Sequence, residues 1–202
     1  MAIRAVIWDL GGVLVRTEVP NPRERLAARY GMTRNEIEGL VFGGESGDKA
    51  QRGEISEEKH WEFIGNKLGL TQGELVDFIA GFWEGDILDT ALIDFIRSLR
   101  PEFKTGLLSN AFGDLRRMLT DVWEIFDAFD EVIISAEVGL VKPDARIYQL
   151  AVSNLGVAPN EAVFIVDFPH NVEGARAVNL QAIHFKSTKQ TLDDLAEILP
   201  GV

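Results

Sequence analysis

The 202-residue chain contains no cysteine, and none of its apolar runs approaches the ~18 residues that a membrane-spanning helix needs. Without thiols it has no disulfide, no thiolate metal site and no cysteine nucleophile. Basic residues are also scarce, because 20 Lys and Arg stand against 32 Asp and Glu, a net charge of −12. Nucleic acids and anionic membrane surfaces are bound through basic patches, so we expect neither as a partner. The first predicted strand begins at residue 3, with nothing like a signal peptide before it, and we expect a soluble, cytoplasmic protein.

The chain has enough apolar residues for a full hydrophobic core. Hydrophobic residues make up 46% of it, and its length suits one domain with an insertion or two small domains. Residues 3–8 form a short β-branched run that predicts a buried strand, although periodicity alone does not separate so short a run from a helix. Asp9 follows this run, and Gly11 and Gly12 then permit a sharp turn or a close approach of the backbone to a ligand.

Three later apolar runs also end in polar residues. The polar residues at these ends are Ser109 and Asn110, then Lys142, and finally Asp167. Taken alone, Asp9 is well explained as a turn residue that closes a strand. In open α/β sheets, however, ligands bind at the carboxyl ends of the strands. The repeated pattern therefore favours a functional site in which these residues and Asp9 share one edge of a sheet.

Strand-like and helix-like segments alternate along most of the chain. This alternation predicts an α/β fold with a Rossmann-like parallel sheet that carries helices on both faces. Residues 16–86 interrupt the pattern with a polar-rich helical stretch that holds no convincing strand. We therefore assign residues 1–15 and 87–202 to a core domain, and residues 16–86 to a small helical domain inserted after the first strand.

Helix-start and helix-stop signals divide this insertion. Ser56 and Thr71 are expected N-caps, the latter with a capping-box Glu, and Gly69 is an expected stop. Residues 43–47 are rich in glycine and are expected to form a loop. We interpret His60 as a structural or exposed side chain. The aromatic residues predicted to form the core of the insertion are Trp61, Phe63, Phe78, Phe82 and Trp83.

Four short motifs, taken in order, resemble those of the haloacid dehalogenase-like (HAD) hydrolase superfamily, most of whose members are magnesium-dependent phosphatases. They are Asp9-Leu10-Gly11-Gly12-Val13-Leu14, Leu108-Ser109-Asn110, Lys142-Pro143-Asp144 and Asp167-Phe168-Pro169-His170-Asn171-Val172-Glu173-Gly174-Ala175. The resemblance covers nearly the whole chain and is greatest to sugar-phosphate phosphatases and to the phosphatase domains of epoxide hydrolases. An insertion directly after the first motif is a cap in this family, which favours a cap for residues 16–86 over a bundle that merely extends the core.

The resemblance implies a hydrolase that cleaves a small phosphate monoester through an aspartyl-phosphate. Asp9 is the expected nucleophile. Ser109 and the backbone amide of Asn110 are expected to bind phosphoryl oxygens, while Lys142 supplies positive charge to the nucleophile and the phosphate. Mg²⁺ prefers oxygen ligands and usually keeps several waters. The expected ligands of Mg²⁺ are Asp9, Asp167 and the backbone carbonyl of Gly11.

Two positions depart from the family pattern. Many members carry a second Asp two residues after the nucleophile, which protonates the leaving group and later activates water, but Gly11 stands there. The last motif often holds two adjacent carboxylates, whereas here Val166 precedes Asp167.

Three functions consequently stay open. They are a magnesium-dependent phosphatase, a metal-independent hydrolase similar to 2-haloacid dehalogenases, and a catalytically weakened binding or regulatory protein. Asp167 favours the phosphatase, because that chemistry needs it as a metal ligand. No pattern in the sequence indicates the substrate or the oligomeric state.

Overall fold

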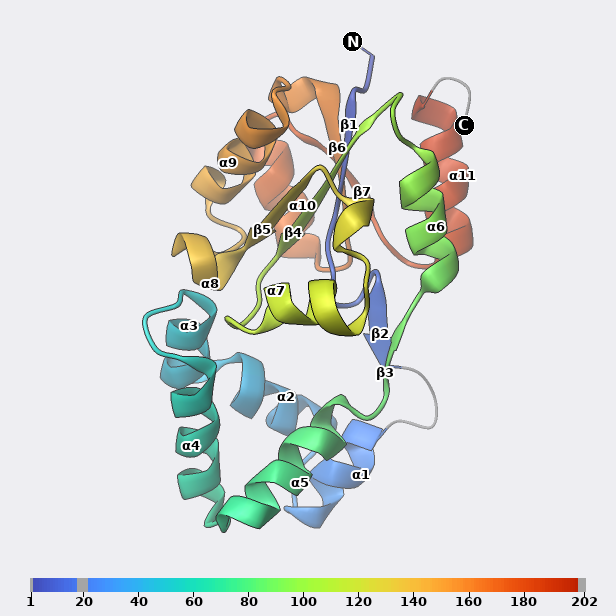
Figure 1. Cartoon of the computed structure of the whole chain (residues 1–202). Helices are drawn as coiled ribbons and strands as arrows, with labels where there is room; N and C mark the ends of the chain where they lie inside the picture. The colour runs from blue at the N-terminus through green and yellow to red at the C-terminus, as the bar shows by residue number, and fades with distance from the viewer. Residues whose placement is uncertain (1, 18–21, 200–202) are drawn as a thin grey trace.

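A central sheet of five parallel strands organises the protein. The computed structural model describes residues 2–17 and 22–199. The strands are β1 (Ala5–Trp8), β4 (Lys104–Ser109), β5 (Glu131–Ile134), β6 (Ala162–Val166) and β7 (Gln181–His184). They lie in the order β5-β4-β1-β6-β7, so that β1 pairs with β4 on one side and β6 on the other (Figure 1). The predicted parallel α/β sheet is confirmed.

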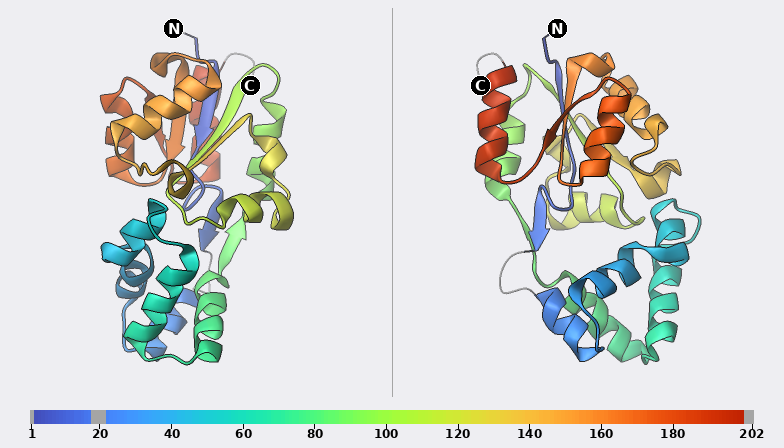
Figure 2. Two further views of the ribbon diagram at one scale, coloured as in Figure 1. Left: turned by 60° about the vertical axis from the view of Figure 1, so that its left-hand side comes forward. Right: turned by 180° about the vertical axis from the view of Figure 1, so that it is seen from behind.

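Helices cover both faces of the sheet, because side chains along each buried strand alternate between the two faces. Trp8 packs with α6 (Thr90–Ser98) and α11 (Thr188–Ile198) in one apolar cluster. Ile7 packs with α9 (Ala145–Leu155) and α10 (Pro169–Ala177) in another. Figure 2 shows these two helix pairs on opposite sides of the sheet. The sheet and these four helices thus form a three-layer α/β/α arrangement.

Short helical turns complete the core. They are α7 (Leu115–Arg117), a π-helical turn at Met118–Val122, 3-10 turns at Phe126–Ala128 and Pro159–Glu161, and α8 (Ser135–Val138). No helix in residues 2–17 and 22–199 is both long enough and apolar enough to cross a membrane.

The inserted segment is helical, as predicted. Its helices are α1 (Pro22–Arg29), α2 (Arg34–Phe42), α3 (Gly44–Gln51), α4 (Glu57–Leu68) and α5 (Gln72–Trp83). The expectation that it holds no strand is wrong at its two ends. There β2 (Val15–Thr17) and β3 (Asp86–Leu88) pair antiparallel and connect the helices to the core. Each strand has only three residues, too few for an alternating pattern to be visible in the sequence.

The capping predictions are confirmed, whereas the glycine-rich loop is not. Ser56 and Thr71 cap α4 and α5 through side-chain acceptors, and Gly69 ends α4 in the left-handed conformation. Residues 44–47 of the predicted loop instead form the start of α3, and Gly43 is its N-cap residue. A Cβ on Gly47 would lie 2.9 Å from the carbonyl carbon of Phe42, so this glycine allows α2 and α3 to pack closely.

Most of the predicted aromatic core of the insertion is buried. Trp61, Phe78 and Phe82 are at most 5% exposed, and their rings meet edge-on or stacked. Trp83 is half-buried. Phe63 is a correction, because it is 49% exposed on the outer side of α4. Residues 61 and 63 fall on different sides of a helix, so only one of them reaches the core.

His60 is a structural residue at the centre of the insertion. It is fully buried, and its Nε2 lies 2.8 Å from the carbonyl oxygen of Val41. Since a carbonyl only accepts, Nε2 carries the proton, and Nδ1 accepts from the hydroxyl of Ser46 at 2.9 Å. Burial lowers the pKa of His60, which keeps the imidazole neutral.

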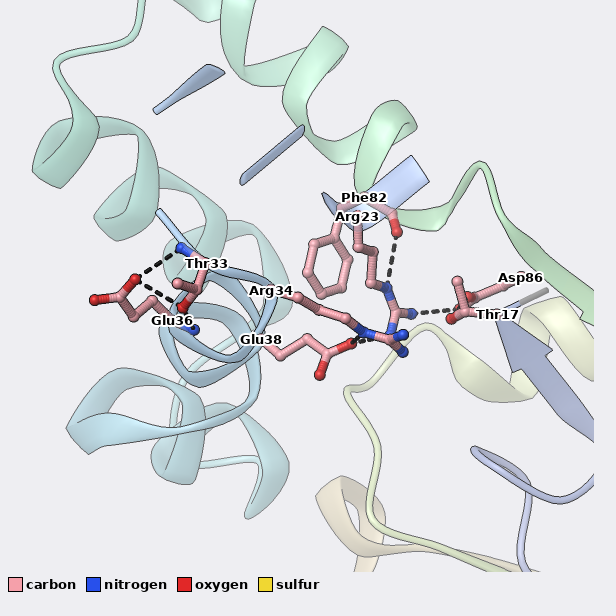
Figure 3. A network of polar contacts seen from close by, with 8 residues as sticks. All are labelled: Thr17, Arg23, Thr33, Arg34, Glu36, Glu38, Phe82 and Asp86. Atoms are coloured by element: carbon pink, nitrogen blue, oxygen red, sulfur yellow. Dashed lines mark hydrogen bonds and ion pairs between the residues drawn. The ribbon is translucent and has the colours of Figure 1, made fainter. Parts of the chain in front are cut away.

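An arginine network joins the insertion to its connecting strands. Arg23 on α1, only 9% exposed at its side chain, binds Asp86 of β3 at 2.7 Å and Glu38 of α2 at 3.1 Å (Figure 3). Its Nε donates to the carbonyl of Phe82 at 3.1 Å. Asp86 also accepts from the hydroxyl of Thr17 on β2 at 2.5 Å. One carboxylate therefore fixes both connecting strands to the first inserted helix.

Candidate active site

Asp9 and Lys142 form a buried ion pair at the carboxyl end of β1. The ammonium nitrogen of Lys142 lies 2.6 Å from Oδ2 of Asp9 and also donates to the carbonyl of Leu108 at 2.9 Å. Oδ1 of Asp9 accepts from the backbone N–H of Leu10 at 2.8 Å. Burial raises the pKa of Asp9 and lowers the pKa of Lys142, and their opposite charges partly offset both effects.

The side chain of Asn110 holds the backbone of Lys142 in place. Its Nδ2 donates to the carbonyl of Lys142 at 3.0 Å, and its Oδ1 accepts from the N–H of Lys142 at 2.8 Å. The amide therefore uses a donor and an acceptor together on the backbone of a single residue, Lys142. Sequence reasoning gave Asn110 a part in phosphoryl binding through its backbone, and this positioning contact of its side chain was not foreseen. Ser109, the last residue of β4, is buried beside it.

Asp167 follows β6, and it lies close enough to Asp9 and Lys142 for their charges to affect its pKa. Within the described part of the chain, its Oδ1 is buried and has no hydrogen-bond partner. Burial, followed by repulsion from Asp9, raises the pKa of Asp167 to about 6. The Asp167 side chain leaves room only for glycine at residue 12. A Cβ on Gly12, where φ is +77°, would lie 2.0 Å from Oδ2 of Asp167.

The ring of His184 on β7 supports the backbone at Asp167. Its Nε2 lies 2.7 Å from the carbonyl oxygen of Asp167 and must carry the proton there, since the carbonyl only accepts. Sequence reasoning missed His184, because a contact between a side chain and the backbone of a neighbouring strand leaves no local sequence signal.

The two positions that depart from the family pattern have different surroundings. A Cβ on Gly11 would meet nothing within 4 Å, and no left-handed φ requires glycine there. Val166, by contrast, is fully buried in the apolar cluster between the sheet and α9 and α10. The space beside the nucleophile is therefore open to a larger side chain, whereas the position before Asp167 belongs to the core.

Asn171 is a further polar residue of the last motif that was given no role from the sequence. It is 3% exposed, and its Oδ1 has no hydrogen-bond partner among residues 2–17 and 22–199. Tyr148 of α9 donates its hydroxyl hydrogen to the carbonyl of Asn171 at 3.1 Å. Burial, with a smaller effect of Asp9, raises the pKa of Tyr148. Asn171 was present in the motif, but only the structure shows that it is a buried residue of α10 whose Oδ1 has no partner among the described residues.

These donors fit a divalent cation. Two carboxyl groups, Asp9 and Asp167, lie near one amine, Lys142, so acidic groups outnumber basic ones at the site. In the described ranges no cluster of three or more His, Cys, Asp or Glu side chains could hold a metal alone. A cation here would use two carboxylates, a backbone carbonyl and water, an oxygen set that Mg²⁺ accepts.

Comparison with known proteins identifies the class. The haloacid dehalogenase-like hydrolase family matches residues 3–179, and the chain belongs to this family. A phosphatase of Mycobacterium tuberculosis, Phosphatase MT3486, is 29% identical over 100% of this chain and 96% of its own length. Bifunctional epoxide hydrolase 2 of Sus scrofa is 26% identical over 98% of this chain, which spans only 39% of that protein.

Among solved structures, a HAD-family enzyme of Bacteroides thetaiotaomicron in complex with magnesium and inorganic phosphate has a TM-score of 0.76. The match covers 93% of this chain and 96% of the other, at 21% identity. At that identity the likeness concerns the fold. The protein is thus a HAD-like hydrolase whose relatives include phosphatases, and the resemblance identified in the sequence is confirmed.

Proposed function

We propose that the protein is a magnesium-dependent phosphatase that hydrolyses a small phosphate monoester through an aspartyl-phosphate. The observation that carries this proposal is Asp167, whose buried Oδ1 has no partner in the described residues and whose pKa is raised to about 6 beside Asp9. A magnesium-dependent phosphatase uses a carboxylate there as a metal ligand, and for this reason we favour it over a metal-independent dehalogenase. Magnesium and phosphate in the related Bacteroides enzyme agree with this choice.

In the proposed reaction, the carboxylate of Asp9 attacks phosphorus in line with the leaving oxygen. The phosphorus–oxygen bond of the ester breaks, and the alcohol leaves with a proton taken from water. Water then attacks the phosphorus of the aspartyl-phosphate and releases inorganic phosphate and Asp9. Phosphoryl transfer depends mainly on positioning and charge. Lys142 supplies a fixed positive charge at the nucleophile, while Ser109 and the backbone amide of Asn110 bind phosphoryl oxygens.

The residues that would hold Mg²⁺ are Asp9, Asp167 and the backbone carbonyl of Gly11. When bound, the ion supplies positive charge that offsets the charge of the phosphate. His184 would hold the backbone carbonyl of Asp167 in position, and Gly12 would leave room for the side chain of Asp167. Such supporting contacts orient ligands and affect metal affinity.

We further propose that residues 16–86 act as a cap, with residues 1–15 and 87–202 forming the core domain. Figure 1 shows α1–α5 below the carboxyl ends of the parallel strands, the edge that carries Asp9. A cap at this edge would exclude water and help to select the substrate. We expect that substrate to be a small-molecule phosphate ester rather than a nucleic acid or a membrane, given the net charge of −12.

The test is a screen of the purified protein against phosphate esters and 2-haloacids, each with Mg²⁺ and with chelator. We expect phosphate release that requires Mg²⁺. Halide release that persists in chelator would contradict the proposal and support a dehalogenase. Binding of phosphate esters without turnover of either class would support a binding or regulatory protein.

A further inference from the structure

The loop that follows β4, residues 110–114, connects three parts of the molecule. Asn110 holds the peptide groups at Lys142 through two hydrogen bonds. The N–H of Ala111 donates to Oγ of Ser135 at 3.0 Å, and that hydroxyl lies 3.2 Å from the carbonyl of Ala111. The N–H of Asp114 donates to Oε2 of Glu57 on α4 at 3.3 Å. The same short loop therefore contacts the candidate site, the core and the insertion.

Phe112, in the middle of this loop, packs into the insertion. It is 6% exposed and belongs to the apolar cluster of the inserted helices, not to either cluster of the core. Its ring centroid lies 5.0 Å from that of His60 and 6.3 Å from those of Trp61 and Phe42. A side chain of the core thus completes the hydrophobic core of the insertion, and its burial stabilises the docked arrangement.

We propose that Phe112 is a positioning residue that makes the placement of Lys142 depend on docking of the insertion. This inference rests on the proposed phosphatase function. Phe112 lies two residues after Asn110, and Asn110 fixes the backbone of Lys142. Lys142 in turn places its ammonium 2.6 Å from Asp9. A continuous path of contacts therefore joins the apolar cluster of the insertion to the nucleophile.

The path has a chemical consequence. Lys142 is held at both ends, by Asn110 at its backbone and by Asp9 and Leu108 at its ammonium. When Phe112 leaves the cluster, the loop loses its apolar contact with the insertion, and the two hydrogen bonds that hold the backbone of Lys142 become less ordered. The ammonium of Lys142 is then held at the phosphate only while the insertion is docked. Docking, which excludes water from the site, is in this way also required for phosphoryl transfer.

The first measurement compares Phe112→Ala with wild type in hydrolysis of p-nitrophenyl phosphate at saturating Mg²⁺. We expect kcat to fall by about 10-fold to 100-fold, the size of effect that a displacement of ~1 Å in a catalytic group produces. Phe78→Ala is the matched control. Phe78 is also buried in the same cluster, at 1% exposure, and its ring contacts are with Tyr30, Trp61 and Phe82 of the insertion. We expect its kcat to change much less.

The second measurement follows the amide hydrogen exchange of Lys142, whose N–H donates to Asn110. Phe112→Ala should speed this exchange and leave the central strand β1 protected, whereas Phe78→Ala should not. Phe112→Leu keeps an apolar side chain in the cluster, and we expect it to lie between wild type and the alanine variant in both measurements. If the alanine variant does not fold, the leucine variant decides the matter by the exchange rate at Lys142.

Unchanged exchange at Lys142 in a folded Phe112 variant would overturn the inference. Equal losses of kcat in the Phe112 and Phe78 variants would also overturn it, because general loosening of the insertion would then suffice. So would a higher KM at unchanged kcat, which would mean that the insertion only binds substrate. If wild type cleaves no phosphate ester but Phe112→Ala still speeds exchange at Lys142, the coupling stands and the proposed phosphatase function fails.

Discussion

Lys142 and Asp9 face each other at 2.6 Å with side chains that are only 1% and 7% exposed. Removing two charges from water costs several kcal/mol per ion, and their mutual attraction repays this only with good geometry and further hydrogen bonds. Both partners have such bonds, to Leu108 and Leu10 respectively. A buried pair of this kind is a weak source of stability, and its position at the end of β1 favours a role in chemistry.

Asp9→Asn should abolish turnover without unfolding the protein. An amide oxygen is a poor nucleophile, so we expect activity to fall by at least about 10³-fold. The variant should also melt at a lower temperature, because Lys142 then lacks its counter-charge, a loss worth about 3–5 kcal/mol for a buried pair. Circular dichroism and phosphate release measure the two effects. Adding Lys142→Met should recover thermal stability but not activity, and full activity in the folded single variant would rule out Asp9 as nucleophile.

Asp167→Asn should raise the Mg²⁺ concentration needed for half-maximal activity or stop the reaction. The amide keeps the shape of the side chain but loses the charge that a divalent cation needs. Mg²⁺ binding by isothermal titration calorimetry gives a readout that is independent of turnover. Asp144→Asn is a control, since that carboxylate is a partly exposed N-cap paired with Arg146. Equal Mg²⁺ affinity in wild type and Asp167→Asn would remove Asp167 from the ligand set.

The stabilisation of the protein by Mg²⁺ should depend on pH. The pKa of Asp167 is raised from 3.8 to about 6, so the folded protein holds this proton more tightly than the unfolded chain. Its contribution to stability is complete below the unfolded pKa and is lost as the pH rises through about 6. Mg²⁺ competes with that proton, and we expect it to raise the melting temperature more near pH 7 than near pH 5. An equal rise at both pH values, or the same pH dependence in Asp167→Asn, would contradict this assignment.

The sequence predicted the parallel sheet and the order of the four motifs along it. Because parallel strands bring their carboxyl ends to one edge of the sheet, it also predicted that Asp9 and Lys142 lie close together. It also predicted the caps at Ser56 and Thr71, which are local signals. The catalytic roles of the site residues stay predictions.

What the sequence did not predict depends on contacts between distant segments. Phe112 reads as an ordinary loop residue until its ring is seen in the cluster of the insertion. His184 reads as part of a strand, although its side chain supports the carbonyl of Asp167. The glycines at the start of α3 predicted a loop, because glycine is favoured both in flexible loops and where two segments pack closely.

The absent carboxylate at Gly11 should determine which phosphate esters are cleaved. A positioned acid or base contributes a factor of about 10² to 10⁴, most of all when the leaving oxygen is too basic to depart unprotonated. We therefore expect wild type to cleave an activated aryl phosphate much faster than an alkyl phosphate. The measurement is the dependence of rate on the pKa of the leaving alcohol at saturating Mg²⁺.

Gly11→Asp tests the cause of that preference. The position has open space for a Cβ and no left-handed φ, so the new side chain should be accepted without strain. It would place a proton donor two residues after the nucleophile and keep the backbone carbonyl for the metal. We expect the alkyl phosphate rate to rise and the dependence on leaving-group pKa to become shallower. Gly12→Ala is the contrasting control, because its Cβ would lie 2.0 Å from Oδ2 of Asp167, and it should weaken Mg²⁺ binding instead. If wild type and Gly11→Asp show the same shallow dependence, another group already protonates the leaving oxygen, and Gly11 does not set the choice of substrate.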